Sequence, residues 1–181
     1  MAKDRKIDLV ILGLLVHEDL TGYDIKKRID GAISFFWKGS FGSIYPALSE
    51  MEKAGLVEKH RADDSCRREK ILYHITDRGM ETLKAWLKGE QAANDLRYET
   101  LLKLYFGGAE GKDTALGNIR CFEEQVRKDL AVLKVYKENL EKVLDRKDHV
   151  YYYLTVTFGI DTYEAYLKWC GKAKRILGGM K

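Results

Sequence analysis

The chain has 181 residues, of which 45% are hydrophobic and 33% are charged, and its formal net charge is +4. This composition excludes an intrinsically disordered chain, and the longest apolar run, residues 9–16, is far shorter than the ~20 residues that a membrane-spanning helix needs. The first residues lack the pattern of a secretory signal, so we expect a cytoplasmic protein with no membrane partner.

The first two predicted helices lie close together near the N-terminus. Residues 7–18, "IDLVILGLLVHE", are apolar on nearly all sides, which predicts a buried helix. The next helix is predicted in "TGYDIKKRID", where Thr21 is suited to be the N-cap and Gly31 to end the helix.

The third predicted helix begins near Ile44 and contains the only proline of the chain, Pro46. Proline breaks helix interiors, but the first N–H groups of a helix have no intrahelical partner, so proline is tolerated in the first turn. With Ser40 or Ser43 as the N-cap, Pro46 falls at or near this turn. The free N–H groups, with the hydroxyls of Ser40, Ser43 and Tyr45, then form a candidate phosphate site, and Pro46 offers an apolar edge to a thymine methyl group. The alternative is that Tyr45 and Pro46 only fix the entry into the helix.

A β-hairpin and a fourth helix are predicted next. "LVEKHR" and "EKILYHI" flank the polar stretch "ADDSCRR", which is typical of two strands around an exposed tip. Thr76 is then suited to cap the helix "TDRGMETLKAWLKG". The order of three helices, hairpin and helix over residues 7–89 is that of a winged helix-turn-helix. In such a unit the third helix enters the major groove of DNA.

Two basic clusters accompany this unit. They are Arg61, Arg67, Arg68 and Lys70 around the hairpin tip, and Lys3, Arg5 and Lys6 before the first helix. Such side chains commonly contact the phosphate backbone, so we include both clusters among the candidate DNA contacts. Asp63 and Asp64 share the tip and would repel phosphate, and each cluster taken alone also fits an ordinary solvated surface.

No pattern of an enzyme or of a cofactor site is found. The chain has no H-E-x-x-H motif, no Gly-rich phosphate loop and no serine-elbow motif. The three cysteines are far apart, which argues against a disulfide framework and a structural zinc site. His60, Cys66 and His74 form one near-cluster on the hairpin. A metal- or redox-sensing site there is the alternative to their being ordinary residues of the wing.

The second half of the chain is predicted to be helical, with one long helix at about residues 113–145. Apolar side chains recur in it every seven residues, with others at complementary positions: Ile119, Val126, Leu133 and Leu140, then Phe122, Tyr136 and Val143. Such a seam holds two packed helices in register. We expect these residues to form an interface with a second chain, with a seam inside one chain as the alternative. Residues 150–160 fit a strand as well as a helix by composition.

Nearly the whole chain resembles the PadR-type transcriptional regulators, in the larger subgroup with a helical C-terminal domain. The resemblance is carried by "ILGLL" (11–15), "GYDIKKRID" (22–30), "FWKGSFGSIYPALSEMEKAGLVEK" (36–59) and "YHITDRGMETLKAWL" (73–87), and by "LLKLYFGG" (101–108) and "YLTVTFGIDTYEAYLKW" (153–169). It implies a mainly α fold, with a winged helix DNA-binding domain at residues 1–89 and a helical, coiled-coil-like dimerisation domain at residues 90–181. It also implies a helical tail.

The resemblance further implies a homodimeric repressor that binds an inverted-repeat operator in double-stranded DNA. Ser43, Tyr45 and Pro46 match recognition-helix positions of the family, and the basic residues of the hairpin match its wing. Trp37 matches a position near which some relatives bind aromatic ligands, which makes a small aromatic effector a candidate partner. The alternative is a winged helix that binds protein or ligand without specific DNA recognition. Steep salt dependence would distinguish DNA binding from this alternative.

Overall fold

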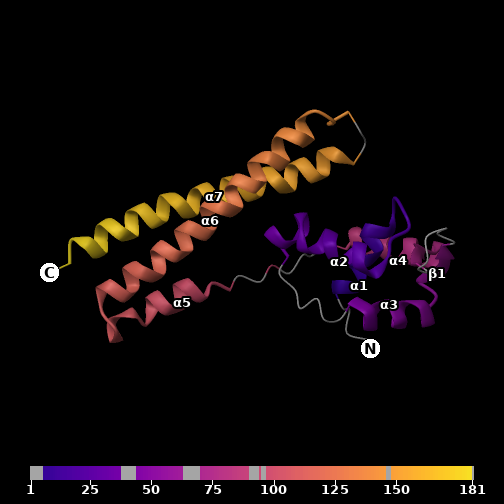
Figure 1. Ribbon diagram of the computed structural model, residues 1–181, viewed down its shortest axis with the longest axis horizontal. Helices are drawn as coiled ribbons and strands as arrows, with labels where there is room; N and C mark the ends of the chain where they lie inside the picture. The colour runs from indigo at the N-terminus through magenta and orange to yellow at the C-terminus, as the bar shows by residue number, and fades with distance from the viewer. Residues whose placement is uncertain are drawn as a thin grey trace. The chain divides into compact units, whose positions relative to one another are not determined.

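The computed structural model describes residues 6–37, 44–62, 70–89, 94, 97–145 and 148–180. The chain divides into two compact units, Met1–Ala93 (unit 1) and Asn94–Lys181 (unit 2), shown in Figure 1. None of the helices in the described ranges combines the length and the apolar character needed to cross a lipid bilayer.

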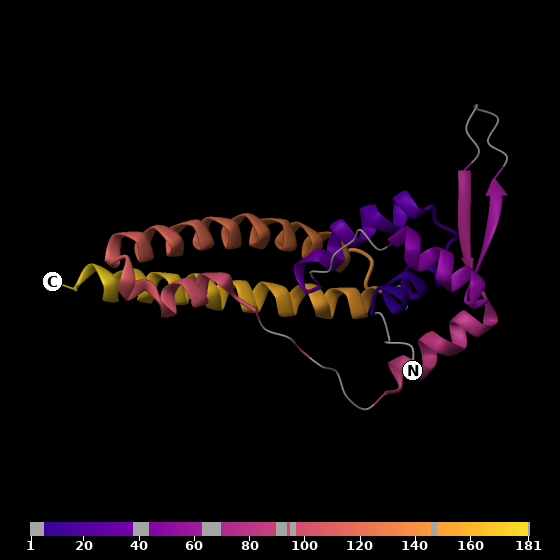
Figure 2. The same cartoon turned by 90° about the horizontal axis from the view of Figure 1, so that it is seen from below.

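Unit 1 is a winged helix, as predicted. Its elements follow in the order α1 (Lys6–Leu15), α2 (Gly22–Asp30), the short 3-10 helix η1 (Ala32–Phe35), α3 (Ile44–Lys53), β1 (Val57–Ala62), β2 (Lys70–Ile75) and α4 (Asp77–Leu87). The two strands pair antiparallel, from Val57 opposite Ile75 to Ala62 opposite Lys70. Figure 2 shows them extending together away from the helices of the unit as the wing.

Two predicted N-caps are confirmed. At the start of α2 the Thr21 hydroxyl accepts a hydrogen bond from the Asp24 N–H (3.1 Å), and the Asp24 carboxylate accepts one from the Thr21 N–H (3.3 Å). This reciprocal pair is a capping box. At the start of α4 the Thr76 hydroxyl accepts from the Gly79 N–H (3.0 Å). Both helices therefore begin directly after the threonine that the sequence indicates as the cap.

A glycine ends α3. Gly55 has φ = 69°, in the left-handed region that glycine adopts without steric cost. The Leu56 N–H donates to the Met51 carbonyl (2.9 Å) and the Gly55 N–H to the Glu52 carbonyl (3.0 Å), which is the Schellman pattern. The chain therefore turns sharply out of α3, and three residues, Ala54 to Leu56, join this helix to the first strand of the wing.

The core of unit 1 lies between α1, α2, α3 and the base of the wing. Its buried side chains are Ile11, Leu12, Leu15, Leu20, Ile25, Ile29, Ile44, Ala47, Leu48, Met51, Val57, Ile75 and Leu83. The inner face of α3, formed by Ile44, Leu48 and Met51, is at most 2% exposed. Burial of this face orients the opposite face of α3 toward solvent.

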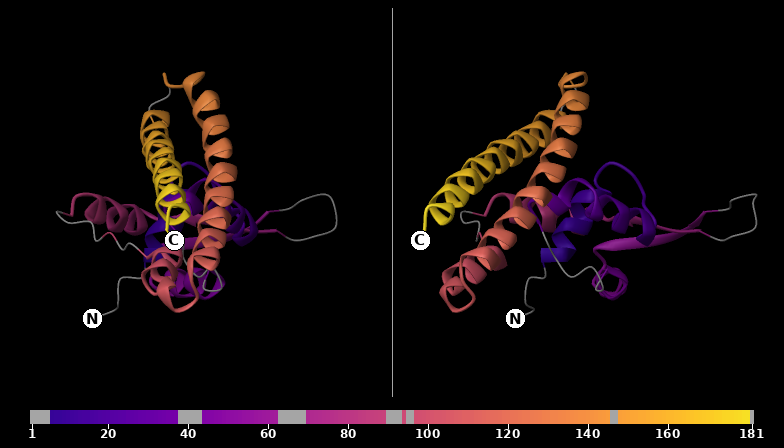
Figure 3. Two further views of the ribbon diagram at one scale, coloured as in Figure 1. Left: turned by 90° about the vertical axis from the view of Figure 1, so that its left-hand side faces the viewer. Right: turned by 60° about the vertical axis from the view of Figure 1, so that its left-hand side comes forward.

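Unit 2 consists of α5 (Glu99–Tyr105), the 3-10 helix η3 (Gly107–Ala109), α6 (Lys112–Glu141) and α7 (His149–Gly178). The two long helices form an antiparallel pair, as the two views of Figure 3 show. Residues 150–160, whose composition also fits a strand, lie inside α7. Val156 and Ile160 of this segment are buried, and this tertiary packing outweighs a weak local preference for extended structure.

The seven-residue seam of α6 lies partly inside this pair. Ile119, Val126 and Leu133 are 0–4% exposed, and the side chain of Leu133 packs against Gly159 of α7. For these three residues the structure shows a partner within the chain, which is the alternative that the sequence left open. Leu130, which follows Asp129, is also buried. The remaining seam residues, Phe122, Tyr136, Leu140 and Val143, are half-buried.

Candidate nucleic-acid interface

The exposed face of α3 begins with Tyr45 and Pro46. Ile44, Ala47 and Leu48 are buried around them, whereas Tyr45 is 62% exposed and Pro46 is exposed. Pro46 is the third residue of α3, where its missing N–H has no intrahelical acceptor to satisfy. The proline is therefore compatible with the helix, and the first turn presents a phenol and a pyrrolidine ring to solvent. Ser40 and Ser43, predicted as its N-cap and hydroxyl donors, lie outside the described residues.

The start of α2 lies directly beside this turn. The Tyr45 ring covers Gly22: a methyl group at Gly22 would lie 2.6 Å from Tyr45 Cε1. The next residue of α2, Tyr23, is 68% exposed. The hydrogen bond from the Thr21 side chain lowers the pKa of the Asp24 carboxyl, which keeps the capping box in its charged form. Two helix starts and two exposed phenols are thus gathered in one region of unit 1.

An ion pair joins the wing to α3. Lys59 Nζ on β1 lies 2.9 Å from Glu52 Oε1 on α3. Because side chains alternate along a strand, Arg61 shares the face of Lys59, and Lys70, which pairs with Ala62, lies on the other face. Arg61 is therefore on the side of the wing that faces α3. Both Arg61 and Lys70 are exposed.

Tyr73 connects the wing to the start of α2. Its N–H and carbonyl form an isolated bridge with Leu20, at 2.9 and 3.2 Å. Burial, together with the nearby Glu52 carboxylate, raises the pKa of the Tyr73 phenol, so this side chain stays neutral near physiological pH. The bridge holds the base of the wing next to the capping box of α2. Arg67 and Arg68 at the tip, with Asp63 and Asp64, lie outside the described residues.

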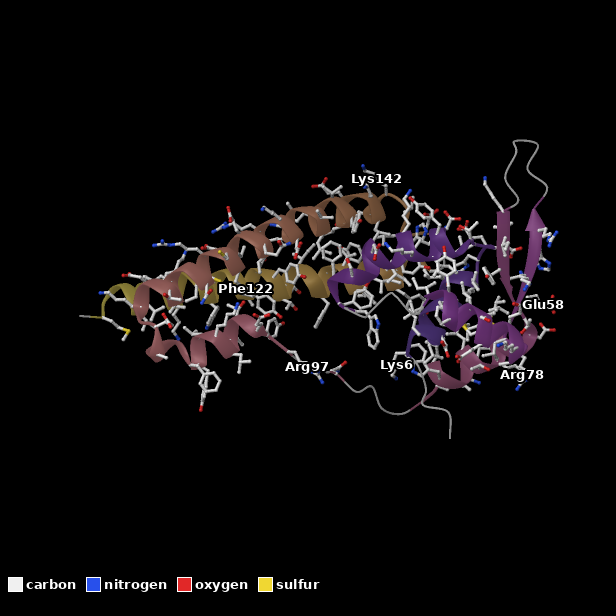
Figure 4. All side chains as sticks on the ribbon, turned by 60° about the horizontal axis from the view of Figure 1, so that its bottom comes forward. Lys6, Glu58, Arg78, Arg97, Phe122 and Lys142 are labelled. Carbon is white, nitrogen blue, oxygen red and sulfur yellow. The ribbon has the colours of Figure 1, made fainter. Side chains whose placement is uncertain are left out.

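Lys6 begins α1 and has a partner on α4. Its ammonium lies 5.5 Å from the centroid of the Trp86 ring, a cation–π arrangement, and Figure 4 shows where Lys6 lies at the start of α1. This contact helps to fix α1 against α4, and its energy at an exposed position is small. Lys3 and Arg5, the other members of the N-terminal cluster, lie outside the described residues.

The two histidines of the wing are close together, and His74 has a further partner on the loop before α2. The rings of His60 and His74 are 6.1 Å apart between centroids, and His74 Nδ1 lies 2.7 Å from Asp19 Oδ1. Within the described ranges no group of three or more His, Cys, Asp and Glu side chains could hold a metal ion. Cys66, the third member of the near-cluster, lies outside them.

Trp37 follows η1 in unit 1. It is half-buried, and its N–H donates to the Ile33 carbonyl (2.9 Å). The preceding residue, Phe36, is 59% exposed. This end of η1 therefore carries two adjacent aromatic side chains, one of which faces solvent.

An aromatic cluster in unit 2 holds α5 against the long helices. Phe122 points from α6 toward α7, as Figure 4 shows, and its ring lies 5.8 Å from that of Tyr166 and 6.4 Å from those of Tyr98 and Trp169. The hydroxyls of Tyr98 and Tyr166 are hydrogen-bonded. Phe122, predicted as a contact to a second chain, thus contributes to packing within unit 2.

Two features of these surfaces escape sequence reasoning. The first is Gly22, whose only signal is a glycine directly after an N-cap, where alanine would be the better helix former. The second is an apolar stripe on α7: Tyr151, Leu154 and Phe158 are 59–69% exposed and follow the spacing of one helix face. The stripe was hidden because its residues belong to a segment whose pattern fits a strand as well.

Two family models match the chain, one on each unit. "Transcriptional regulator PadR-like family" matches residues 11–85, and "Virulence activator alpha C-term" matches residues 96–178. The negative transcriptional regulator PadR of Bacillus subtilis is 27% identical over 173 residues, which are 91% of this chain and 93% of that protein.

Solved structures are similar over almost the entire chain. The crystal structure of Bacillus subtilis PadR in complex with operator DNA has a TM-score of 0.85 at 25% identity, covering 97% of this chain and 99% of that one. PadR of the same species in complex with p-coumaric acid has a TM-score of 0.75 at 25% identity, covering 96% and 99%. The PadR-like regulator BC1756 from Bacillus cereus has a TM-score of 0.84 at 29% identity, covering 98% and 99%. The matches of a PadR-like model to the winged helix of unit 1 and of a second model to the helical unit 2 place this chain in the PadR-like family of transcriptional regulators.

Proposed function

We propose that this protein is a homodimeric repressor that binds an inverted-repeat operator through α3 and the wing. The observation that carries the proposal is the exposed first turn of α3, where Tyr45 and Pro46 face solvent while the rest of the turn is buried. A phenol hydroxyl is a neutral donor to phosphate oxygens, and the proline ring is a suitable contact for a thymine methyl group. The similarity to a relative crystallised with operator DNA supports the same role here.

In this proposal the wing contacts the phosphate backbone of DNA. Arg61 lies on the side of β1 that faces α3, so a duplex held by α3 is within reach of its guanidinium. Lys70 on the other face, the tip arginines Arg67 and Arg68, and the N-terminal Lys3, Arg5 and Lys6 remain predicted contacts. Contacts of this kind give affinity and salt dependence, whereas base recognition rests on α3.

Dimerisation is proposed to use two exposed apolar surfaces at opposite ends of the α6–α7 pair. One is the stripe of Tyr151, Leu154 and Phe158 on α7. The other lies on α5, where Leu102 and Phe106 are 58% and 64% exposed and line an open hollow of about 510 Å³ against α6. With a twofold axis between the copies, the α7 stripe of each copy packs against the α5 surface of the other. Both unlike surfaces are then buried in one closed dimer.

Release by a small aromatic effector completes the proposal. It is supported by the relative crystallised with p-coumaric acid, and Trp37 remains the predicted contact in this chain. Such a ligand can shift the protein away from its DNA-binding form only to the extent that it binds another form more tightly. Titration of p-coumaric acid into the protein–operator complex, with the Trp37→Phe variant in parallel, tests both the effector and its site.

The decisive experiment measures binding to the DNA upstream of the protein's own gene. Fluorescence anisotropy is the readout, and random DNA is the competitor. We expect specific binding that weakens by about a thousandfold between about 50 and 200 mM salt, as ~6 phosphate contacts require. Tyr45→Ala should weaken operator binding by about tenfold or more without unfolding the protein, because the buried face of α3 is unchanged. Binding no stronger than to random DNA would reject the proposal for this operator and favour a winged helix that serves another partner.

A further inference from the structure

Gly22 and Tyr45 compete for one space. Gly22 is the buried first residue of α2, and Tyr45 is the second residue of α3. A methyl group at Gly22 would lie 2.6 Å from Tyr45 Cε1, 3.1 Å from Cζ and 3.3 Å from Cδ1. The first distance is shorter than carbon atoms tolerate without a shift of one partner, so the phenol ring occupies the volume that any side chain at position 22 would need.

The backbone on the Gly22 side of this contact is held firmly. The capping box between Thr21 and Asp24 fixes the entry into α2, with hydrogen bonds of 3.1 and 3.3 Å. One residue earlier, Leu20 is bridged to Tyr73 of the wing by hydrogen bonds of 2.9 and 3.2 Å. Because α2 cannot retreat without breaking these bonds, a side chain at position 22 would act on the Tyr45 ring, whose other side faces solvent.

A glycine at this position is unfavourable by local rules. Glycine has a low helix propensity, and alanine is generally the better residue within a helix. The structure describes one contact that removes this preference, the ring of Tyr45. The residue is therefore selected by the space between α2 and α3, and not by the conformation of its own backbone.

We infer that Gly22 is a positioning residue for DNA recognition. The Tyr45 ring packs directly against the Gly22 backbone, and this contact sets the direction in which the phenol hydroxyl points. The inference rests on the proposed DNA contact of Tyr45. Direction matters because a hydrogen bond weakens steeply when donor and acceptor are misaligned. A Tyr45 ring displaced from Gly22 would keep its hydroxyl donor, but the donor would no longer be aligned with its acceptor on DNA.

The test is a double-mutant cycle on operator affinity with Gly22→Ala, Tyr45→Ala and the double variant, at one fixed salt concentration. We expect Gly22→Ala to weaken operator binding by about tenfold, as when one hydrogen bond to a charged group is lost. In the Tyr45→Ala background the same change should have no further effect, since the methyl group then finds room. Gly13→Ala on α1, where a methyl group would meet no atom within 4 Å, is the matched control and should bind like the parent.

A second readout needs no DNA. The ring signals of Tyr45 in protein labelled with ¹³C-tyrosine, identified by their loss in Tyr45→Ala, should shift in Gly22→Ala and stay in place in Gly13→Ala. If the parent showed no preference for the operator, that result would reject the proposed function. The ring signals would still test the inference: unchanged Tyr45 signals in Gly22→Ala would overturn it. Operator binding by the parent with undiminished binding by Gly22→Ala would overturn the inference alone.

Folding of the variants is checked by circular dichroism before binding is measured. If Gly22→Ala does not fold, the double variant decides: a folded double variant that binds like Tyr45→Ala identifies the ring as the group that excludes a side chain at position 22. A double variant that also fails to fold would show that the backbone, and not Tyr45, requires the glycine. Equal losses of affinity from Gly22→Ala in both backgrounds would likewise overturn the inference.

Discussion

Gly79, in the first turn of α4, has no room for a side chain. A methyl group there would lie 2.2 Å from the Leu56 carbonyl oxygen and 3.0 Å from Leu12 Cδ2. The carbonyl belongs to the backbone and accepts a hydrogen bond from the Thr76 N–H (3.2 Å), so it is not free to move aside. The close approach of α4 to the end of α3 thus depends on a missing Cβ atom, as the approach of α3 to α2 does at Gly22.

We therefore expect Gly79→Ala to lower the free energy of unfolding by about 1–3 kcal/mol or more, the range for an overpacked core. Urea denaturation followed by circular dichroism measures the change. Gly13→Ala, which fills open space on α1, should change stability by no more than about 1 kcal/mol and in the stabilising direction. Equal effects of the two substitutions would contradict the packing described for α4.

At the scale of elements, the α6–α7 pair contains a close contact between a large and a small residue. Leu133 is 2% exposed and its Cδ1 atom would lie 3.0 Å from a methyl group at Gly159. The glycine of one helix thus receives the leucine of the other. Such close contact lets two long helices without a disulfide keep one register.

Leu133→Ala should lower the free energy of unfolding by about 2–5 kcal/mol, because it removes buried methyl groups and leaves a cavity in the pair. Chemical denaturation monitored by circular dichroism provides the measurement. Leu133→Met, which keeps the volume, should cost less than about 1.5 kcal/mol. A negligible effect of the alanine variant would show that the seam is not closed within the chain.

The buried phenols of α7 make the stability of unit 2 decrease at alkaline pH. Burial, together with the nearby Asp129 carboxylate, raises the pKa of Tyr163 to about 12, and burial with the hydrogen bond to Tyr98 raises that of Tyr166. In the unfolded chain a tyrosine titrates at about pH 10. Between these values the folded state retains a proton that the unfolded state has lost, so stability is fully present below about pH 10 and falls as the pH rises toward 12.

The melting temperature, followed by circular dichroism from about pH 9 to about pH 12, should therefore fall less steeply for Tyr163→Phe than for the parent. Tyr105→Phe is the matched control, because Tyr105 is 83% exposed and its removal leaves the slope unchanged. Parallel curves for the parent and Tyr163→Phe would refute the burial of this phenol as the cause.

At the scale of the whole molecule, recognition of an inverted repeat requires two recognition helices at a set distance. Their separation is then determined by unit 2, which carries no DNA contact in the proposal. Two half-sites bound by linked winged helices gain affinity from the high effective concentration of the second helix. Dimerisation and operator affinity should therefore be lost together.

Leu154→Glu places a charge in the centre of the exposed stripe of α7 and should convert the proposed dimer to a monomer, since an apolar interface does not accommodate an unpaired carboxylate. Analytical ultracentrifugation measures the mass, and anisotropy the operator affinity, which should fall by about a hundredfold or more. Thr155→Glu introduces the same charge at an exposed neighbour outside the stripe and should remain dimeric. A dimeric Leu154→Glu protein would place the interface elsewhere.

Much of unit 1 follows from local sequence signals. Thr21, Thr76 and Gly55 mark helix ends by chemistry that acts within a few residues, and the alternation around the hairpin predicts its strands. The placement of Tyr45 and Pro46 on an exposed first turn follows from helix periodicity alone. What periodicity cannot show is the neighbour that each exposed residue meets, and so neither Lys6 on Trp86 nor Tyr45 on Gly22 was foreseen.

For unit 2, local sequence signals predict less of the structure than for unit 1. The period of seven residues in α6 predicts an apolar seam, but a seam reads the same whether its partner is a distant segment of one chain or a second molecule. The choice lies in α7, whose segment 150–160 has a composition suited to two kinds of structure. Only once α7 is helical and packed on α6 do Ile119, Val126 and Leu133 become internal and the stripe of α7 become the exposed surface.

The sequence by itself therefore determined the order of elements, the helix ends, the winged helix and the candidate recognition turn, because these depend on propensities and caps that act over one or two turns. The tertiary structure alone decided which apolar residues are core and which are surface in unit 2, and which glycines provide space for a neighbour. The physical reason is that burial and close approach are properties of pairs of segments far apart in the chain, and no local pattern contains the partner.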